Sequence, residues 1–168
     1  MDLGGLGLDS VGLDPAASFI AVDDRLRASE GLWAMGDVTG KGMFTHVALY
    51  QAAIVGADIL GQNPPGADYA AMPRVVFTDP EVAAVGLTEA AARAAGIDVA
   101  VTVKSLSATF RGWLHGPGNA GFVKLVADRS GGTLLGATAV GPHGGEVLGA
   151  LSVAVHANVP IAVLQRMI

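Results

Sequence analysis

The residues with the clearest capacity for chemistry are Gly36 and Asp37, which follow directly on the apolar run Gly31–Met35. A carboxylate at the carboxyl end of an apolar strand, in an α/β context, lies where ligands normally bind. Gly36 would let a ligand approach closely because it has no side chain. An ionised Asp only accepts hydrogen bonds, so Asp37 suits a sugar-type hydroxyl donor. A turn that Asp37 merely caps is an equally open alternative.

A helix is predicted to begin shortly after this pair, near His46. The first N–H groups of a helix have no partner inside the helix, and they carry a partial positive charge. Such a terminus attracts an anion or an electron-rich oxygen. The succession of strand, Gly-Asp, glycine-rich loop and helix N-terminus therefore predicts a site for a polar ring system with a sugar-like tail.

The other polar candidates carry weaker signals. The segment Gly116–Gly121, GPGNAG, does not follow a strand and open a helix, so we predict a turn and not a phosphate-binding loop. By residue type alone, His46 could act as a base beside Asp37. The histidines have no short metal-ligand spacing and no cysteine to support a zinc site; they are His46, His115, His143 and His156.

The elements that must position Gly36 and Asp37 lie in the first third of the chain. The segment Met1–Pro15 is glycine-rich without a clean period, and we expect a connector there. Ser18–Val22 predicts a short strand, and Gly31–Met35 predicts a second. From about Phe44 an apolar helical pattern runs to a stop at Gly61, with Thr45 as a candidate N-cap.

The proline-containing stretch Gln62–Asp68, QNPPGAD, is a linker by composition, and the pattern of predicted elements changes after it. Strands, one early helix, a hairpin and two late helices then predict an α+β unit with helices on one face of an antiparallel sheet. We therefore expect two domains, residues 1–62 and 74–168, joined by a linker at 63–73. The expected strands are Arg74–Thr78, Val82–Gly86, Val99–Leu106, Gly121–Ala127 and Thr133–Val140, and the expected helices are Thr88–Ala95, Gly144–Asn158 and Ile161–Met167.

Composition excludes several classes of function. The 168 residues carry a net charge of −5 without a cluster of Lys or Arg, which argues against nucleic-acid binding. They contain no cysteine, and hence no disulfide framework, thiolate metal site or cysteine nucleophile. The uncharged stretches Gly42–Ala57 and Val147–Gln165 contain polar residues or proline, so we predict core helices and no membrane span. The acidic N-terminus is unlike a signal peptide, and we expect a cytoplasmic protein.

Several long segments resemble one family. SEGLWAMGDVTGKGMFTHVALYQAAIVGADILG resembles the second FAD-contacting motif of the flavin-dependent pyridine nucleotide–disulfide oxidoreductases. PRVVFTDPEVAAVGLTEAAARAAGI is similar to the opening of that family's C-terminal dimerisation domain, and GFVKLVADRSGGTLLGATAVGPHGGEVLG resembles its central hairpin and following helix. The motifs stand in the family's order and cover nearly the whole chain. The resemblance implies the C-terminal end of a FAD-binding α/β domain followed by a dimerisation domain.

The resemblance implies roles for named residues. Asp37, after Gly36, would bind the ribityl chain of FAD. The start of the helix would lie at the pyrimidine edge of the flavin and favour negative charge on the reduced ring, through Phe44, Thr45, His46 and Ala48. Arg111 and Trp113 would form an exposed-loop pair facing a partner subunit. The intact enzyme would be a homodimer that uses NAD(P)H and FAD to reduce a disulfide-type or metal-ion acceptor.

Departures from the family pattern bear on activity. The sequence lacks a Gly-x-Gly-x-x-Gly motif, a redox-active cysteine pair, a second dinucleotide site and the catalytic His-Pro-Thr segment. We therefore expect a C-terminal piece of such an enzyme, with only part of the FAD site and without activity of its own. The large apolar fraction, 51%, would reflect surface buried against an N-terminal FAD/NAD half and a second subunit. The alternative is a non-catalytic dimerisation or interaction module.

Overall fold

The computed structural model describes residues 2–168, which fold as two compact units with a division between Tyr69 and Ala70. In the first unit, β1 (Arg27–Ser29) and β2 (Leu32–Trp33) form a small antiparallel sheet. The 3-10 turn η3 (Gly36–Thr39) follows, and then the long helix α1 (Thr45–Ile59). The unit thus has the strand, Gly-Asp turn and helix that the sequence predicts, with Gly61 ending the helix in a left-handed conformation.

Three sequence predictions for this unit are wrong. In the segment expected to be a connector, residues 2–15 contain two 3-10 helices, η1 (Gly4–Leu6) and η2 (Leu8–Val11), and Leu3 and Leu8 are buried. They pack with Ile20 and Ala34 in one cluster, so the segment belongs to the folded unit. Ser18–Val22 forms no strand. Thr45 is the first helical residue and not the N-cap, a position that Phe44 occupies without a side-chain cap.

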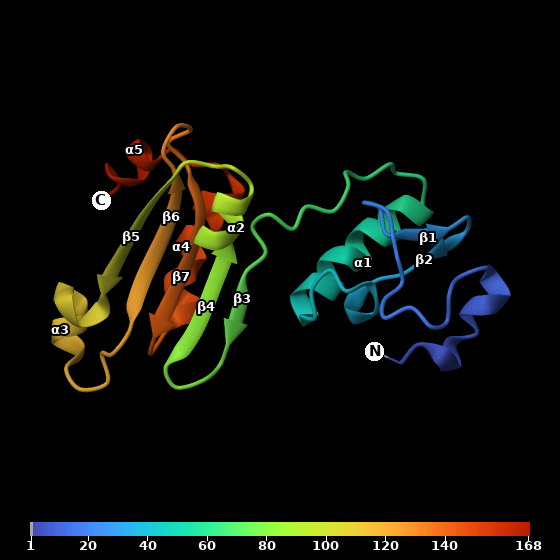
Figure 1. Ribbon diagram of the computed structural model, residues 1–168, viewed down its shortest axis with the longest axis horizontal. Coiled ribbons are helices and arrows are strands. Elements are labelled where there is room, and N and C mark those ends of the chain that lie inside the picture. The colour runs from blue at the N-terminus through green and yellow to red at the C-terminus, as the bar shows by residue number, and fades with distance from the viewer. Residues whose placement is uncertain (1) are drawn as a thin grey trace. The chain divides into compact units, whose positions relative to one another are not determined.

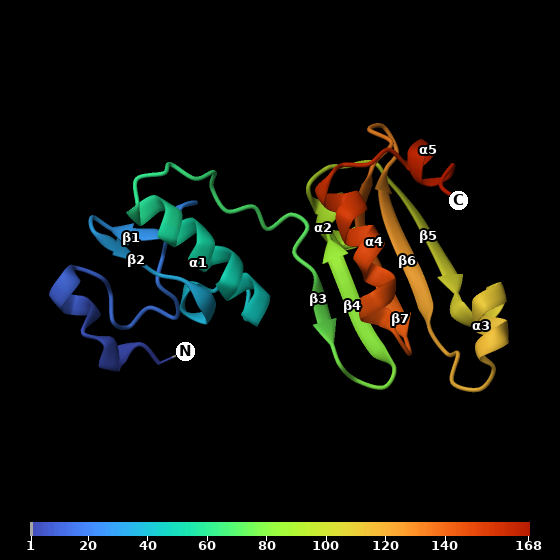
Figure 2. The same cartoon turned by 180° about the vertical axis from the view of Figure 1, so that it is seen from behind.

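The second unit is an antiparallel five-stranded sheet with strand order β3-β4-β7-β6-β5. Its strands are β3 (Arg74–Val76), β4 (Glu81–Gly86), β5 (Val99–Ser105), β6 (Phe122–Asp128) and β7 (Leu134–Gly141). The helix α4 (Gly144–His156) covers one face, as Figures 1 and 2 show from opposite sides. The short helices are α2 (Glu89–Ala94), α3 (Phe110–His115) and α5 (Ile161–Leu164), and the 3-10 turn η4 (Leu106–Ala108) precedes α3. The α+β class is confirmed, but the expectation that the helices lie on one face is wrong. Leu125 of β6 packs on the α4 side, whereas the next residue, Val126, packs with Ala92 of α2 on the opposite face.

The core of this unit lies between α4 and the sheet. Leu148 and Ala154 of α4 pack against Val85 of β4 and Ala137 of the central strand β7, with Leu134 at the start of β7. The closeness of β4 and β7 depends on glycine, because a Cβ at Gly86 would overlap the Leu135 carbonyl, and its φ of 68° is left-handed.

The helix α3 of the second unit was not predicted from the sequence. Arg111 and Trp113 lie on the helix α3 and not in a loop. The Thr109 hydroxyl caps this helix by accepting a hydrogen bond from the Gly112 N–H at 3.0 Å. The GPGNAG segment that follows leads into β6 without forming a helix, so its prediction as a turn is confirmed.

Candidate functional site

The Gly36–Thr39 turn presents Asp37 to solvent. Gly36 is buried with φ 78°, a left-handed conformation that favours glycine. The Thr39 hydroxyl donates to the Gly36 carbonyl at 2.8 Å, and the Gly40 N–H donates to the Asp37 carbonyl at 3.1 Å. The Asp37 carboxylate accepts no hydrogen bond from any residue that the structure describes. It therefore does not cap its own turn, and its oxygens are available to an external donor.

The buried amide of Gln51 fixes this turn against α1. Its Oε1 accepts a hydrogen bond from the Gly36 N–H at 2.5 Å, and its Nε2 donates to the Tyr69 hydroxyl at 2.8 Å. A longer contact of 3.5 Å joins Nε2 to the Thr39 hydroxyl. Gln51 is 0% exposed and Gly36 is buried, so the Gln51 amide and the Gly36 N–H depend on each other for a partner. The backbone carrying Asp37 is held by a saturated buried network.

The start of α1 lies beside the same turn. A Cβ placed on Gly36 would lie 3.7 Å from the Ala48 Cβ, which shows how closely the glycine packs on the first turn of the helix. Phe44 is half-buried, and its ring stacks on His46 with centroids 5.2 Å apart and an interplanar angle of 25°. Thr45 and His46 are exposed. The structure thus brings Gly36 and Ala48 together. Of the other predicted residues, Asp37 lies in η3, and Phe44, Thr45 and His46 lie at the start of α1.

This arrangement is suited to binding and not to covalent catalysis. A free carboxylate accepts hydrogen bonds from hydroxyl groups, and the α1 N-terminus adds a partial positive charge next to it. Among residues 2–168, no group of three or more metal-ligating side chains could hold a metal ion. Within the same residues no helix is long and apolar enough to cross a membrane.

Sequence reasoning missed two buried polar residues of α1. Residues Val47, Gln51, Ile54 and Asp58 form the buried stripe of the helix. Their spacing of four, three and four residues is that of one helical face. A Gln and an Asp on an otherwise apolar stripe are a signal that could have identified them, because buried polar side chains need partners.

Asp58 ties α1 to both strands of the first unit. Its carboxylate accepts two hydrogen bonds from Arg27, each 2.6 Å long, and one from the Trp33 indole at 2.9 Å. The hydrogen bonds from Arg27, and secondarily from Trp33, lower the pKa of Asp58, while Asp58 raises the pKa of Arg27. A carboxylate with a lowered pKa in the folded state stabilises that state above its unfolded pKa and loses this contribution as the pH falls.

We expect the first unit to lose stability as the pH falls through the lowered pKa of Asp58, because protonation removes the charged acceptor of the Arg27 and Trp33 hydrogen bonds. Trp113→Phe leaves Trp33 as the only tryptophan, so its fluorescence reports on the first unit alone. In this background Asp58→Asn should lower the urea midpoint at pH 7 and flatten its fall between pH 5 and pH 3. Asp9→Asn, at an exposed carboxylate, is the matched control. An unchanged acid response in Asp58→Asn would contradict the assignment.

Comparisons with known proteins agree with this architecture. The family profile described as pyridine nucleotide-disulphide oxidoreductase, dimerisation domain, matches residues 72–168. The chain is 41% identical over 138 residues to a dihydrolipoyl dehydrogenase of Chlorobaculum tepidum, covering 82% of this chain and 29% of the relative. It is 36% identical over 142 residues to mycothione reductase of Mycobacterium tuberculosis, covering 81% and 31%. The chain therefore spans about three tenths of the length of these curated relatives.

Solved structures give the same result. LpdA from Mycobacterium tuberculosis superposes with a TM-score of 0.87 at 28% identity, covering 99% of this chain and 37% of that one. The flavoprotein disulfide reductase RclA from Escherichia coli superposes with a TM-score of 0.79 at 30% identity, covering 90% and 35%. With the profile match over more than half of its residues, the chain belongs to the pyridine nucleotide-disulphide oxidoreductase family and carries that family's dimerisation domain.

Proposed function

We propose that this chain supplies the second flavin contact and the dimerisation domain of an FAD-dependent oxidoreductase. The whole enzyme would pass reducing equivalents from NAD(P)H to a disulfide-type or metal-ion acceptor. Family membership and relatives named dihydrolipoyl dehydrogenase and mycothione reductase support this reaction class. A relative in the solved structures is named a flavoprotein disulfide reductase. A cytoplasmic location stays a prediction from the sequence.

The observation that carries the proposal is the free carboxylate of Asp37, held beside the start of α1 by the Gly36–Gln51 hydrogen bond. FAD fits these groups chemically. A ribityl hydroxyl can donate to Asp37, and Gly36 has no side chain to obstruct the approach. The first turn of α1, with Phe44, Thr45, His46 and Ala48, would face the pyrimidine edge, where its dipole stabilises negative charge.

Bound FAD would supply hydride and electron transfer, and the residues of this chain would orient it. The 168 residues contain no cysteine, so the redox disulfide would belong to another segment of the whole enzyme. An N-terminal half would likewise supply the first FAD contact and the NAD(P)H site. The isolated chain would then bind FAD weakly and catalyse nothing.

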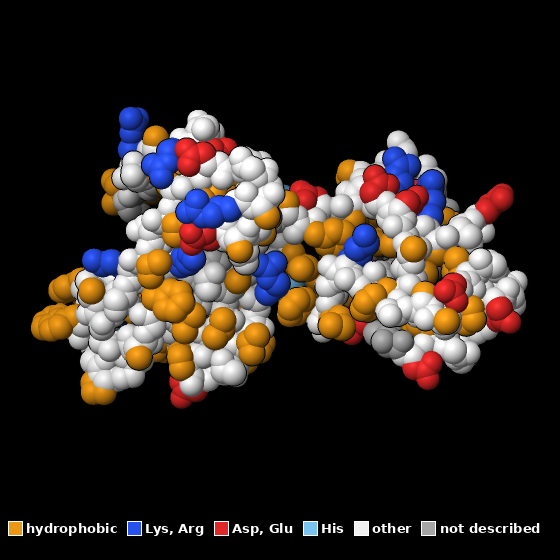
Figure 3. Space-filling model, viewed as in Figure 1, with side chains coloured by type: hydrophobic (Ala, Val, Ile, Leu, Met, Phe, Trp, Pro, Cys, Tyr) orange, Lys and Arg blue, Asp and Glu red, His pale blue; other side chains and the backbone are white. Residues whose placement is uncertain are grey.

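A second candidate is a non-catalytic dimerisation module, which exposed aromatic residues of α3 favour. Phe110 is 75% exposed and Trp113 is 68% exposed, and their rings lie 5.9 Å apart between centroids. Figure 3 shows hydrophobic side chains gathered at the end of the second unit where Figure 1 places α3. Exposed apolar patches of this kind mark interaction surfaces. We propose that this pair contacts a second copy of the chain.

We expect the purified chain to be a dimer in size-exclusion chromatography with light scattering. Replacing Phe110 and Trp113 together by Ser should shift it toward monomer, because the change removes the aromatic anchors of the contact. Phe77→Ser is the matched control, since Phe77 is 84% exposed on the β3–β4 connection. A monomeric parent chain, or a double variant that stays fully dimeric, would contradict the proposed interface.

A further inference from the structure

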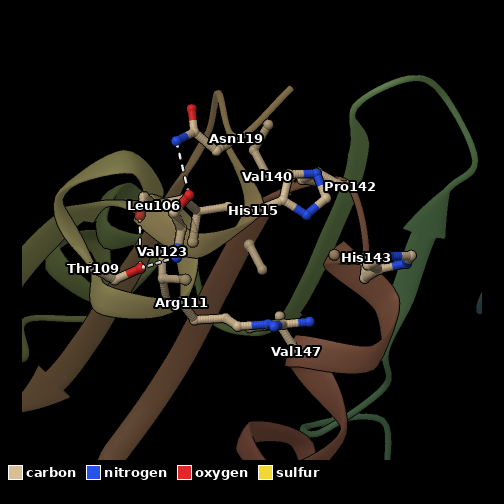
Figure 4. A pocket seen from close by; sticks show the side chains of 14 residues that line it. Leu106, Thr109, Arg111, His115, Asn119, Val123, Val140, Pro142, His143 and Val147 are labelled. Atoms are coloured by element: carbon tan, nitrogen blue, oxygen red, sulfur yellow. Dashed lines mark hydrogen bonds between the residues drawn. The ribbon is translucent and has the colours of Figure 1, made fainter. Parts of the chain in front are cut away.

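The second unit contains a pocket that the proposed flavin and dimer contacts do not use. Its volume is about 380 Å³, and it lies between α3, the β6–β7 strands and the start of α4. Leu106, Val123 and Val147 contribute apolar walls, and Arg111 and His115 are among the polar residues that line it. Figure 4 shows the Arg111 side chain extending from α3 toward Val147 on α4. The size and the mostly apolar lining are those of a small-molecule site.

The pocket occupies a different face of α3 from the exposed aromatic pair. Arg111, Gly112 and His115 line it, whereas Phe110 and Trp113 do not. Positions i and i+4, here 111 and 115, share one helical face, and positions 110 and 113 share another. The pocket and the proposed dimer contact can therefore be tested separately.

The wall formed by α3 is fixed by local hydrogen bonds. The Asn119 amide donates to the Gly112 carbonyl at 2.9 Å, drawn as a dashed line in Figure 4. The Thr109 hydroxyl accepts from the Gly112 N–H and donates to the Leu106 carbonyl at 2.6 Å. A Cβ at Gly112 would overlap the same carbonyl, so α3 packs tightly on η4. Arg111 is thus presented from an ordered element.

The pocket has a positively charged lining residue, Arg111, and no negatively charged one. Arg111 makes no ion pair or hydrogen bond with any other residue in 2–168. No Asp or Glu lines the pocket, whereas His115 and His143 do. Glu81, whose Oε2 accepts a hydrogen bond from the Gly145 N–H at 3.0 Å, is not among the residues that line the pocket. An unpaired guanidinium at an apolar pocket complements a ligand with one anionic end and an apolar body.

We propose that this pocket binds a small amphiphilic carboxylate, with its carboxylate on Arg111 and its hydrocarbon part against Leu106, Val123 and Val147. The guanidinium pairs with a carboxylate in fork geometry and so selects for the anion. The site lies wholly within the second unit. It goes beyond the proposed function, because it requires neither FAD nor the Asp37 turn.

The test uses hexanoate and its neutral analogue hexanamide as probes of the ¹⁵N-labelled full chain, titrated by NMR. Hexanoate should shift the amide signals of Gly112, Gly141 and their neighbours and bind roughly tenfold more tightly than hexanamide, as a charge-assisted hydrogen bond predicts. Arg111→Met keeps the apolar stem and removes the charge, so it should equalise the two ligands. Arg166→Met, outside the pocket, should leave the preference unchanged.

Val147→Phe is the second variant, since it places a larger ring in the pocket from an exposed position of α4. It should abolish the binding of both probes while leaving the rest of the spectrum unchanged. Equal affinity of hexanoate and hexanamide for the parent chain would overturn the proposal. Unimpaired hexanoate binding by the Val147→Phe variant would also overturn it. A dimer in which the second copy covers the pocket, so that the pocket signals do not respond to hexanoate, would overturn it as well.

Discussion

Replacing Gln51 by Leu is expected to lower the free energy of unfolding of the first unit by about 1–3 kcal/mol. The Gln51 Oε1 is the partner of the Gly36 N–H, and Nε2 donates to the Tyr69 hydroxyl. Leu fills a similar volume but cannot bond to either group, which leaves a buried N–H without a partner. The cost of that orphaned donor is the reason for the expected loss.

The measurement is urea unfolding followed by Trp33 fluorescence in the Trp113→Phe background. Gln62→Leu is the matched control, because Gln62 lies exposed just beyond α1 and its change should cost under about 0.5 kcal/mol. Two equal urea midpoints, for Gln51→Leu and Gln62→Leu, would show that the buried amide does not support the Gly36–Thr39 turn.

Replacing Asp37 by Ala is expected to weaken FAD binding about tenfold to hundredfold in a chain that contains a complete flavin site. The estimate follows from losing a hydrogen bond to a charged acceptor, which contributes about 1.5–3 kcal/mol. A suitable host is a chimera of the Chlorobaculum tepidum dihydrolipoyl dehydrogenase, in which this chain replaces the matched segment. The 41% identity over 138 residues makes the exchange practicable.

The readout is the dissociation constant for FAD, measured by flavin fluorescence after the cofactor has been stripped and returned. Asp37→Asn keeps one carbonyl acceptor and should have a smaller effect than Asp37→Ala. Asp9→Ala is the control, since Asp9 lies exposed in η2. An Asp37→Ala chimera with parental affinity for FAD would remove Asp37 from the site.

Most elements of the second unit could be predicted from the sequence, for local reasons. The β6–β7 hairpin has β-branched strands on either side of a turn with two glycines, residues 128–132. Thr88 predicts the start of α2, and its hydroxyl does accept a hydrogen bond from the Ala91 N–H at 3.1 Å. These signals lie within a few residues of the element they define, so no distant contact is needed to interpret them.

The elements that were missed depend on contacts distant in sequence. Leu3 directly precedes the first 3-10 helix and Leu8 begins the second, and both pack against Ile20 and Ala34. A glycine-rich segment shows no periodic pattern that would reveal such packing. The helix α3 contains a glycine and spans only six residues, which makes its helical pattern too short to recognise. Ser18–Val22 has strand-like residues but no neighbouring strand to pair with in the described structure.

For the candidate site, the order of residues predicted the turn and the helix but not the hydrogen bond that holds them together. Gly36 and Asp37 lie between β2 and α1, as expected. The hydrogen bond that fixes them comes from Gln51, 15 residues further along the chain. Whether Asp37 caps its turn depended on side-chain geometry, which residue types alone do not determine. The roles of Asp37 and of the α1 N-terminus in flavin binding remain a proposal.

The central claim is that these 168 residues complete a flavin site, and the FAD content of the unmodified chimera tests it most directly. We predict that the chimera is purified as a folded dimer with close to one FAD per subunit, measured from its visible absorbance and protein concentration. A folded dimeric chimera without flavin, alongside a parent enzyme prepared in the same way and fully loaded with it, would contradict the claim.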